Sequence, residues 1–268
     1  MCFNLTFGAI SVNGRDACYL WHEEIAGRDG CDVASAILAF LTSQPQTVRN
    51  IRISADNCAP QNKNWVLYSS MMSLLCSPSA LDSVTIKYLE RGHTYMKPDS
   101  IHGAIGRRLR RENEVLEFSD LTNLISKSMS GLEIRQLVPA DFLPLVSCKD
   151  AKVATFPKLR MLKEVHFEKN SKFFFYKYSI DAHSYFKRPF VKDSVPSLPN
   201  SSSRPRGISS KKKDNICHAL VPLMPESKRC FWTNLKVAQV DDLCNCNATN
   251  TTWLSLCRGI ILSFKSHF

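Results

Sequence analysis

The sequence lacks three features that would each place it in a particular class of protein. No run of apolar residues is long enough to cross a bilayer, which excludes a membrane-spanning helix. The first residues do not combine a charged start, a long apolar run and a small-residue cleavage site, so we expect an intracellular protein with no membrane partner. No two cysteines are separated by two residues, the spacing typical of zinc sites.

Cysteine and positive charge, in contrast, are plentiful. The 268 residues include 11 cysteines, and this odd number favours free thiols that are mostly small buried side chains. The formal net charge is +11, which favours an acidic partner, with nucleic acid ahead of an anionic membrane surface. The plainer explanation is a basic surface that only aids solubility. A hydrophobic content of 44% is enough for a packed core.

Apolar periodicity predicts a mixed sheet with helices on its faces. Alternation of apolar residues predicts strands, and spacings of three and four residues predict helices. The expected order in the first half is strand, strand, helix, strand, helix, strand, helix, which is typical of an α/β fold. The strands are expected at residues 2–10, 17–22, 51–55 and 84–89, and the helices begin near residues 32, 65 and 99.

The segment 51–64 is the most informative stretch of the chain. A strand ends at Asp56, and a polar loop then leads into a helix at Trp65. Ligands of α/β proteins gather where strands end, so the carboxylate could hold a cation, and the loop could meet phosphate oxygens through Gln61, Asn62 and Lys63. The plainer interpretation is that Asp56 begins a turn and an asparagine caps the helix.

A second carboxylate follows the next strand. If the two strands are neighbours, Asp56 and Asp99 converge on one cation, and His102 lies on the same helix face as Asp99. Two acids are too few for a secure two-metal site, so Asp32 is a candidate third ligand and Glu23 a weaker one. Each residue also has a structural explanation, because acids at helix starts commonly act as caps or complement the helix dipole.

The helix that begins near Asp99 ends in a cluster of four arginines. Positive side chains suit the C-terminal end of a helix, but four are more than the dipole requires, so phosphate contact is a second interpretation. His93, in the loop before this helix, could orient a neighbour by hydrogen bonding. The arginines are Arg107, Arg108, Arg110 and Arg111.

Several long motifs resemble a known family. The runs SADNCAPQNKNW and YLERGHTYMKPDSIHGAI, preceded by YLWHEEIAGRDGCDVAS, resemble an uncharacterised transposon-derived domain of animal proteins. RPRGISSKKKDNI with PLMPESKRCFW resembles that family's closing segment. The domain in turn resembles the ribonuclease-H-like cores of transposases and integrases, the aspartate–aspartate–acid nucleases. The resemblance implies that Asp56 is the acid at the end of the fourth strand, that Asp99 is the acid on the following helix, and that Asp32 stands where the family usually has glutamate.

The chain departs from that family at its start. In the family, a first strand ahead of the hairpin carries another aspartate, and this strand and its acid are expected to be missing here. Loss of a ligand usually removes cation binding, so Mg²⁺ or Mn²⁺ is expected to bind weakly or not at all. Loss of a central strand also leaves a sheet edge unpaired. The resemblance therefore implies a ribonuclease-H-like core, residues 1–112, without its first strand.

The second half is predicted to add smaller elements. Residues 113–190 are expected to form an α+β extension that contains a hairpin, whose second strand carries the aromatic run 173–178. These rings either stack on bases or pack in a core. Residues 191–207 are a linker, 208–242 a helical segment and 243–268 a poorly defined tail. The basic residues 204–213 fit nuclear import, phosphate binding or a solvated helix start.

Three functions are compatible with these patterns. The first is a transposase-derived domain that binds nucleic acid but is catalytically impaired or inactive. The second is an active Mg²⁺-dependent nuclease or strand transferase that uses Asp56, Asp99 and a substitute acid. The third is a non-enzymatic interaction module or an incomplete gene product. The basic charge and the resemblance favour the first.

Overall fold

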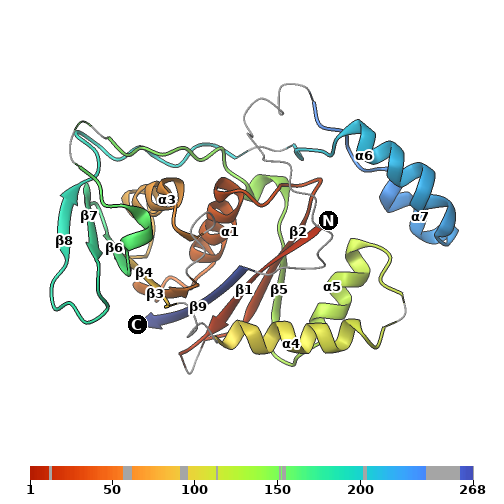
Figure 1. The fold of residues 1–268 in the computed structure, drawn as a ribbon, viewed down its shortest axis with the longest axis horizontal. Helices are drawn as coiled ribbons and strands as arrows, with labels where there is room; N and C mark the ends of the chain where they lie inside the picture. The colour runs from red at the N-terminus through yellow and green to blue at the C-terminus, as the bar shows by residue number, and fades with distance from the viewer. Residues whose placement is uncertain are drawn as a thin grey trace.

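The fold is mixed α/β, as expected, and is built on a single nine-stranded sheet (Figure 1). The computed structural model describes residues 1–11, 14–56, 62–90, 96–112, 114–150, 152, 155–201 and 204–239, and the backbone of residues 260–267. The strand order is β5-β2-β1-β9-β3-β4-β6-β7-β8.

The sheet begins with the predicted hairpin. Strands β1 (Cys2–Ala9) and β2 (Ala17–His22) are antiparallel, with Phe7 opposite Ala17. Both faces of β1 are covered, which explains why nearly all of its residues are buried. Leu5 and Phe7 belong to the main core, whereas Thr6 hydrogen-bonds to His102 on the opposite side.

Two strand–helix units follow, and both were predicted from periodicity. Helix α1 (Gly30–Thr42) leads to β3 (Asn50–Ala55), and α3 (Trp65–Cys76) leads to β4 (Ser83–Tyr88), which is parallel to β3. Helices α1 and α3 cover one face of the sheet, and α4 (Lys97–Leu109) and α5 (Phe118–Ser126) cover the other (Figure 1).

The position between β1 and β3 holds the C-terminal strand β9 (Ile260–His267). β9 is parallel to β1 and antiparallel to β3. The tail was expected to be poorly defined, and the gap beside β3 was expected to leave an unpaired edge. The edges of β1 and β3 pair with β9, so the expected unpaired edge is not found there. Residues 243–259 and 268 of the predicted tail lie outside the described residues.

The second half of the chain extends the same sheet at both edges. β6 (Glu164–Glu168) pairs with β4, followed by β7 (Phe173–Lys177) and β8 (Phe186–Pro189), and β5 (Glu133–Gln136) pairs with β2. Within residues 113–190, the strands β5 to β8 therefore belong to the same sheet as the strands of the first half. Short 3-10 helices, η1 (Pro139–Asp141) and η2 (Leu159–Met161), lie between these strands.

The aromatic strand β7 alternates between two faces. Phe174 and Tyr176 are buried in the main core, whereas Phe173 and Phe175 are half-buried on the other face of the sheet. The core interpretation therefore holds for every second ring. Asn170, in the turn before this strand, has φ of 55°, a conformation that asparagine tolerates better than most residues.

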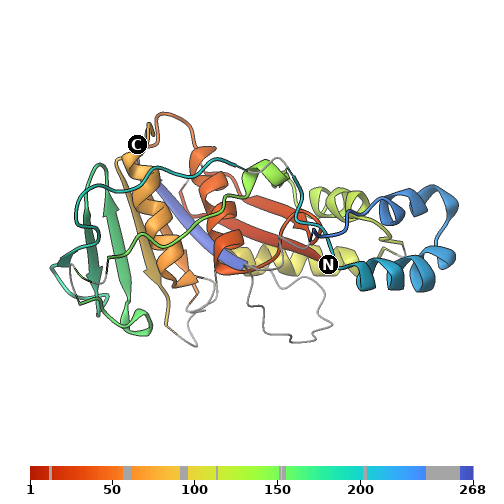
Figure 2. The ribbon, with the colours of Figure 1, turned by 90° about the horizontal axis from the view of Figure 1, so that it is seen from above.

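A helical segment follows β8 in the chain. It consists of α6 (Ser210–Asn215), the π-helical turn η3 (Ile216–Leu220), η4 (Val221–Leu223) and α7 (Glu226–Thr233). This segment lies at one end of the molecule and β6–β8 at the other (Figure 2). Among the helices described, none has the length and apolarity needed to cross a membrane. The seven described cysteines are free thiols, but only Cys18 is fully buried.

Candidate functional site

The two predicted catalytic carboxylates, Asp56 and Asp99, lie at a similar position along the direction of the strands. Asp56 directly follows β3. If the pairing of β3 with β9 is continued by one residue, Asp56 stands beside Ile261, which pairs with Thr6 of β1. Because neighbouring strands are about 4.8 Å apart, the backbones of Asp56 and Thr6 are roughly 10 Å apart.

Helix α4 brings Asp99 over the same part of the sheet. Its first turn is fixed to β1, because Lys97 Nζ lies 2.8 Å from Asp16 Oδ1 and donates to the Ala9 carbonyl at 3.0 Å. Pro98 packs so closely on Gly8 that an added Cβ would lie 2.6 Å from the proline ring. Asp99 Oδ2 accepts the Met96 N–H at 2.6 Å. The helix thus begins before Asp99, which serves as a capping residue at its third position.

His102 lies one turn further along α4 and contacts β1 directly. Its Nε2 is 2.8 Å from Thr6 Oγ1. The Thr6 hydroxyl donates to Asn4 Oδ1 at 3.0 Å, and its oxygen lies 3.4 Å from Cys18 Sγ. Burial lowers the pKa of the His102 imidazole, so the neutral ring is favoured at neutral pH. The ring therefore joins the helix to the sheet through a buried polar network.

The acids suggested as further ligands are committed to other partners. Asp32 is 1% exposed, completes the N-terminal capping box of α1 with Asp29, and is paired with Arg206. Glu23 accepts from Lys212 at 2.5 Å and from the Met1 amino group at 3.1 Å. Within the described residues, no group of three His, Cys, Asp or Glu side chains is placed to hold a metal ion.

The loop residues predicted to contact phosphate are mostly structural where they are described. Lys63 is 2% exposed, donates to the Leu162 carbonyl at 2.7 Å, and lies 4.4 Å from the centre of the Tyr88 ring. Burial, together with the charge of Lys163, lowers its pKa to about 8. Lys63 therefore has a structural role in this structure, and its contact with phosphate stays a prediction.

Asn62 supports Asp56 instead of meeting solvent. It is 1% exposed, its Nδ2 donates to Asp56 Oδ1, and its carbonyl accepts the Tyr88 hydroxyl at 2.6 Å. Asn62 therefore has a structural role here, and its contact with nucleic acid stays a prediction. Its Oδ1 is buried and has no hydrogen-bond partner among the described residues. Gln61 and His93 lie outside the described residues.

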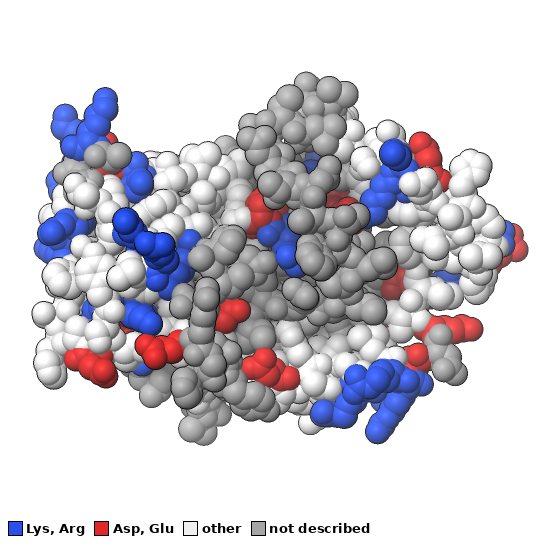
Figure 3. All heavy atoms as spheres, in the orientation of Figure 1, with Lys and Arg blue, Asp and Glu red and all other residues white. Residues whose placement is uncertain are grey.

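The arginine cluster is on the surface, as predicted. Arg107, Arg110 and Arg111 are exposed, whereas Arg108 is half-buried and pairs with Glu112 at 3.0 Å. In Figure 3, basic side chains gather over the end of α4. Other basic side chains lie over β6–β8 at the opposite end of the same view.

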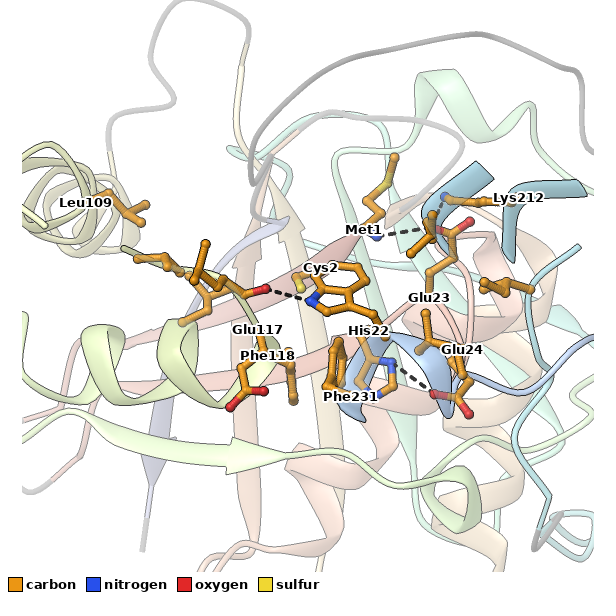
Figure 4. Close-up of a pocket in the computed structure, with 17 residues that line it drawn as sticks. Met1, Cys2, His22, Glu23, Glu24, Leu109, Glu117, Phe118, Lys212 and Phe231 are labelled. Atoms are coloured by element: carbon orange, nitrogen blue, oxygen red, sulfur yellow. Dashed lines mark hydrogen bonds and ion pairs between the residues drawn. The ribbon is translucent and has the colours of Figure 1, made fainter. Parts of the chain in front are cut away.

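Sequence reasoning missed a pocket between the sheet and the C-terminal helices. The cavity has a volume of about 480 Å³, and mostly apolar side chains of α5, η3 and α7 line it. His22 and Glu24 lie on one wall, with Phe118 and Phe231 against the histidine ring (Figure 4). No local motif marks this pocket, because its walls come from segments separated by more than 200 residues.

These features define the chain as an α/β protein whose helix α4 carries Asp99 in its first turn and exposed arginines at its end. A family model described as "Domain of unknown function (DUF7869)" matches residues 4–186. The chain therefore belongs to that family. Comparisons with curated proteins and with solved structures give no match.

Proposed function

We propose that this chain is a transposase-derived, ribonuclease-H-like domain that binds nucleic acid and is catalytically impaired. The observation that carries the binding proposal is the exposed cluster Arg107, Arg110 and Arg111 at the end of α4. The same helix carries Asp99 in its first turn. Three guanidinium groups on one helix end exceed what the helix dipole needs, and they suit the phosphates of a nucleic-acid backbone.

The arrangement of the central strands supports the ribonuclease-H-like part of the proposal. The neighbouring strands β2, β1, β9, β3 and β4 give a hairpin, a central strand and then two parallel strands. The resembled core has the same succession, with its first strand in the central place. The proposal is further supported by Asp56, directly after β3, and Asp99, on the following helix α4, because the resemblance assigns the acids of the core to these two residues.

The carboxylates available as metal ligands support the proposal that catalysis is impaired. The strand between β1 and β3 in this chain is β9, which runs antiparallel to β3, and its sequence IILSFKSH contains no Asp or Glu. The two candidate substitutes, Asp32 and Glu23, are ion-paired. Two-metal phosphoryl transfer needs several carboxylates around its cations, and the described residues do not supply them. We propose that Mg²⁺ or Mn²⁺ binds weakly at most.

The binding proposal is tested by fluorescence anisotropy with labelled DNA and RNA, single-stranded and double-stranded, over a series of salt concentrations. The variant replaces Arg107, Arg110 and Arg111 with alanine. We expect weaker binding and a salt slope that falls by about 0.9 per lost phosphate contact on duplex DNA. The matched control removes the same charge from the exposed residues Lys127, Lys152 and Lys158.

The control separates a phosphate-binding surface from general basicity. If both triple variants lose affinity equally, the arginine cluster has no special role. If wild-type protein binds none of the four nucleic acids with a salt-dependent affinity, the proposal of nucleic-acid binding fails.

A further inference from the structure

The pocket between the sheet and the C-terminal helices has the size and composition of a small-molecule site. Its volume of about 480 Å³ lies within the usual range for ligand pockets, and is roughly three times that of a cavity that holds benzene. Phe118 and Leu121 line it from α5, and Phe231 and Trp232 from α7. Aromatic side chains from two directions favour a flat apolar guest.

The walls of this pocket are held in place by contacts at its rim. Lys228 Nζ lies 2.9 Å from Glu117 Oε1 and 2.5 Å from Asp120 Oδ1, which joins α7 to the start of α5. Trp232 Nε1 donates to the Leu116 carbonyl at 2.9 Å, and this bond orients the indole ring. The cavity is therefore bounded by fixed side chains, and such a preformed site loses little entropy when a ligand binds.

Two of the three carboxylates that line the pocket, Glu23 and Glu117, are paired with cations. Glu23 is paired with Lys212 at 2.5 Å and with the Met1 amino group, and Glu24 Oε1 accepts the Lys236 N–H at 2.9 Å. A charged ligand would lose its hydration in this mostly apolar space, and an anion would find no free cation there, because Lys212 is already paired with Glu23. The pocket therefore favours an uncharged molecule.

His22 is a polar side chain of the pocket whose ring nitrogens can form further hydrogen bonds. Its ring is flanked edge-on by Phe118 and Phe231, with centroids 4.9 and 5.6 Å away, and its side chain is 16% exposed. The nearest acid is Glu24, 3.8 Å from Nδ1, which is too long for a hydrogen bond. Among the described residues, neither ring nitrogen of His22 has a hydrogen-bond partner, so a ligand hydroxyl or N–H could supply one.

We infer that this pocket binds a neutral aromatic molecule that carries one hydrogen-bonding group, and that His22 is the residue that recognises this group. The aromatic and aliphatic walls supply the binding surface, and the histidine supplies orientation. The inference does not rest on the nucleic-acid surface proposed at the end of α4, although Leu109 of that helix also lines the pocket, so either proposal can fail without the other.

Calorimetric titration of the full chain with two probes tests the inference. The probes are naphthalene and 1-naphthol, which differ by one hydroxyl group. We expect one saturable site per chain for both, with 1-naphthol bound about fivefold more tightly through its hydrogen bond to His22. In His22→Phe, naphthalene should still bind, and the preference for 1-naphthol should disappear.

Two variants that fill the pocket from opposite walls locate the binding. Leu121→Trp on α5 and Ile216→Trp on η3 should each weaken 1-naphthol binding at least tenfold, an effect on the order of 1.4 kcal/mol. Val138→Trp, at an exposed position outside the pocket, should bind as the wild type does. Thermal melts identify which variants are folded.

The inference is overturned if neither probe shows saturable binding to the wild type. It is also overturned if both filled variants fold and bind 1-naphthol as tightly as the wild type. A preference for 1-naphthol that persists in His22→Phe would remove the role assigned to His22.

Discussion

The guanidinium group of Arg206 donates two hydrogen bonds to the buried carboxylate of Asp32, from Nη2 to Oδ1 at 2.5 Å and from Nη1 to Oδ2 at 3.0 Å. Burial raises the pKa of the Asp32 carboxyl, and the Arg206 charge offsets part of that rise. The pair joins the start of α1 to a segment 174 residues later in the chain. It therefore fixes the C-terminal helices to the core and leaves neither side chain for a ligand.

Replacement of Arg206 should destabilise the protein, because the buried charge of Asp32 would then have no partner. We expect Arg206→Ala to lower the free energy of unfolding by about 3 kcal/mol, because Asp32 stays buried without its partner. Urea denaturation measures the change. The control Arg160→Ala, at an exposed position, should cost less than about 0.5 kcal/mol. Addition of Asp32→Asn to Arg206→Ala should recover part of the loss, and equal effects of Arg206→Ala and Arg160→Ala would contradict the prediction.

Lys63 should make stability rise with pH in the mildly alkaline range. Its pKa is lowered to about 8 in the folded protein, from 10.5 as the ordinary value. Between these two values the unfolded chain binds more protons than the folded chain, so the free energy of unfolding increases as pH rises. Urea denaturation at pH 7.5, 8.5 and 9.5 should show the wild type gaining stability relative to Lys63→Met.

An exposed lysine is the control for the Lys63 measurement. Lys158→Met makes the same substitution at an exposed position and is the variant against which the pH dependence of Lys63→Met is compared. A stability difference for Lys63→Met that does not vary with pH would show that the Lys63 ammonium is not held in a low-dielectric site.

Adjacent aromatic residues of β7 offer a direct test of the extended sheet. Phe174 is 0% exposed and lies against Tyr68 of α3, with ring centroids 5.6 Å apart, whereas Phe175 is half-buried on the other face. We expect Phe174→Ala to cost about 3–5 kcal/mol and Phe175→Ala about 1 kcal/mol, measured by urea denaturation. Similar costs for the two would show that β7 does not alternate between the core and the outer face.

Local patterns were sufficient to predict most elements of the first half. The alternation in β1, β2, β3 and β4 and the apolar faces of α1, α3 and α4 are each contained within one short segment. Elements stabilised by distant partners were missed. β5 has only four residues, with none fully buried, and it is a strand because β2 supplies an edge. β8 depends in the same way on β7.

The role of a site residue could be predicted only where it follows from the position of that residue in its own strand or helix, and not where it depends on a distant partner. Asp56 and the exposed arginines follow from their positions at the end of a strand and of a helix. The burial of Lys63 could not be predicted, because its acceptor, the Leu162 carbonyl, is 99 residues away. The partner of Asp32 was equally hidden, since the basic segment that contains Arg206 fits a solvated surface just as well in sequence terms.

A proline in β9 should reveal how much the central strand contributes. Ser263 pairs with Gly8 of β1 and with Ser54 of β3, so its backbone lies between two ladders. Ser263→Pro removes a backbone N–H there and should cost about 3 kcal/mol or more in guanidinium denaturation. Ser201→Pro, at an exposed position outside any strand, is the control and should have little effect. If the two variants are equally stable, β9 does not hold the sheet together.

Metal-dependent activity is the most direct test of impairment. We expect labelled DNA and RNA to remain intact with wild-type protein in Mg²⁺ or Mn²⁺, because the described donor set supplies too few carboxylates for a two-metal site. The melting temperature should likewise be the same with and without either ion, since a ligand stabilises a folded protein only as far as it binds. Asp56→Asn is the matched variant and should behave as the wild type in both assays. Cleavage by the wild type that disappears in Asp56→Asn, or a cation-induced rise in melting temperature that this variant abolishes, would instead establish a working metal centre at the end of β3.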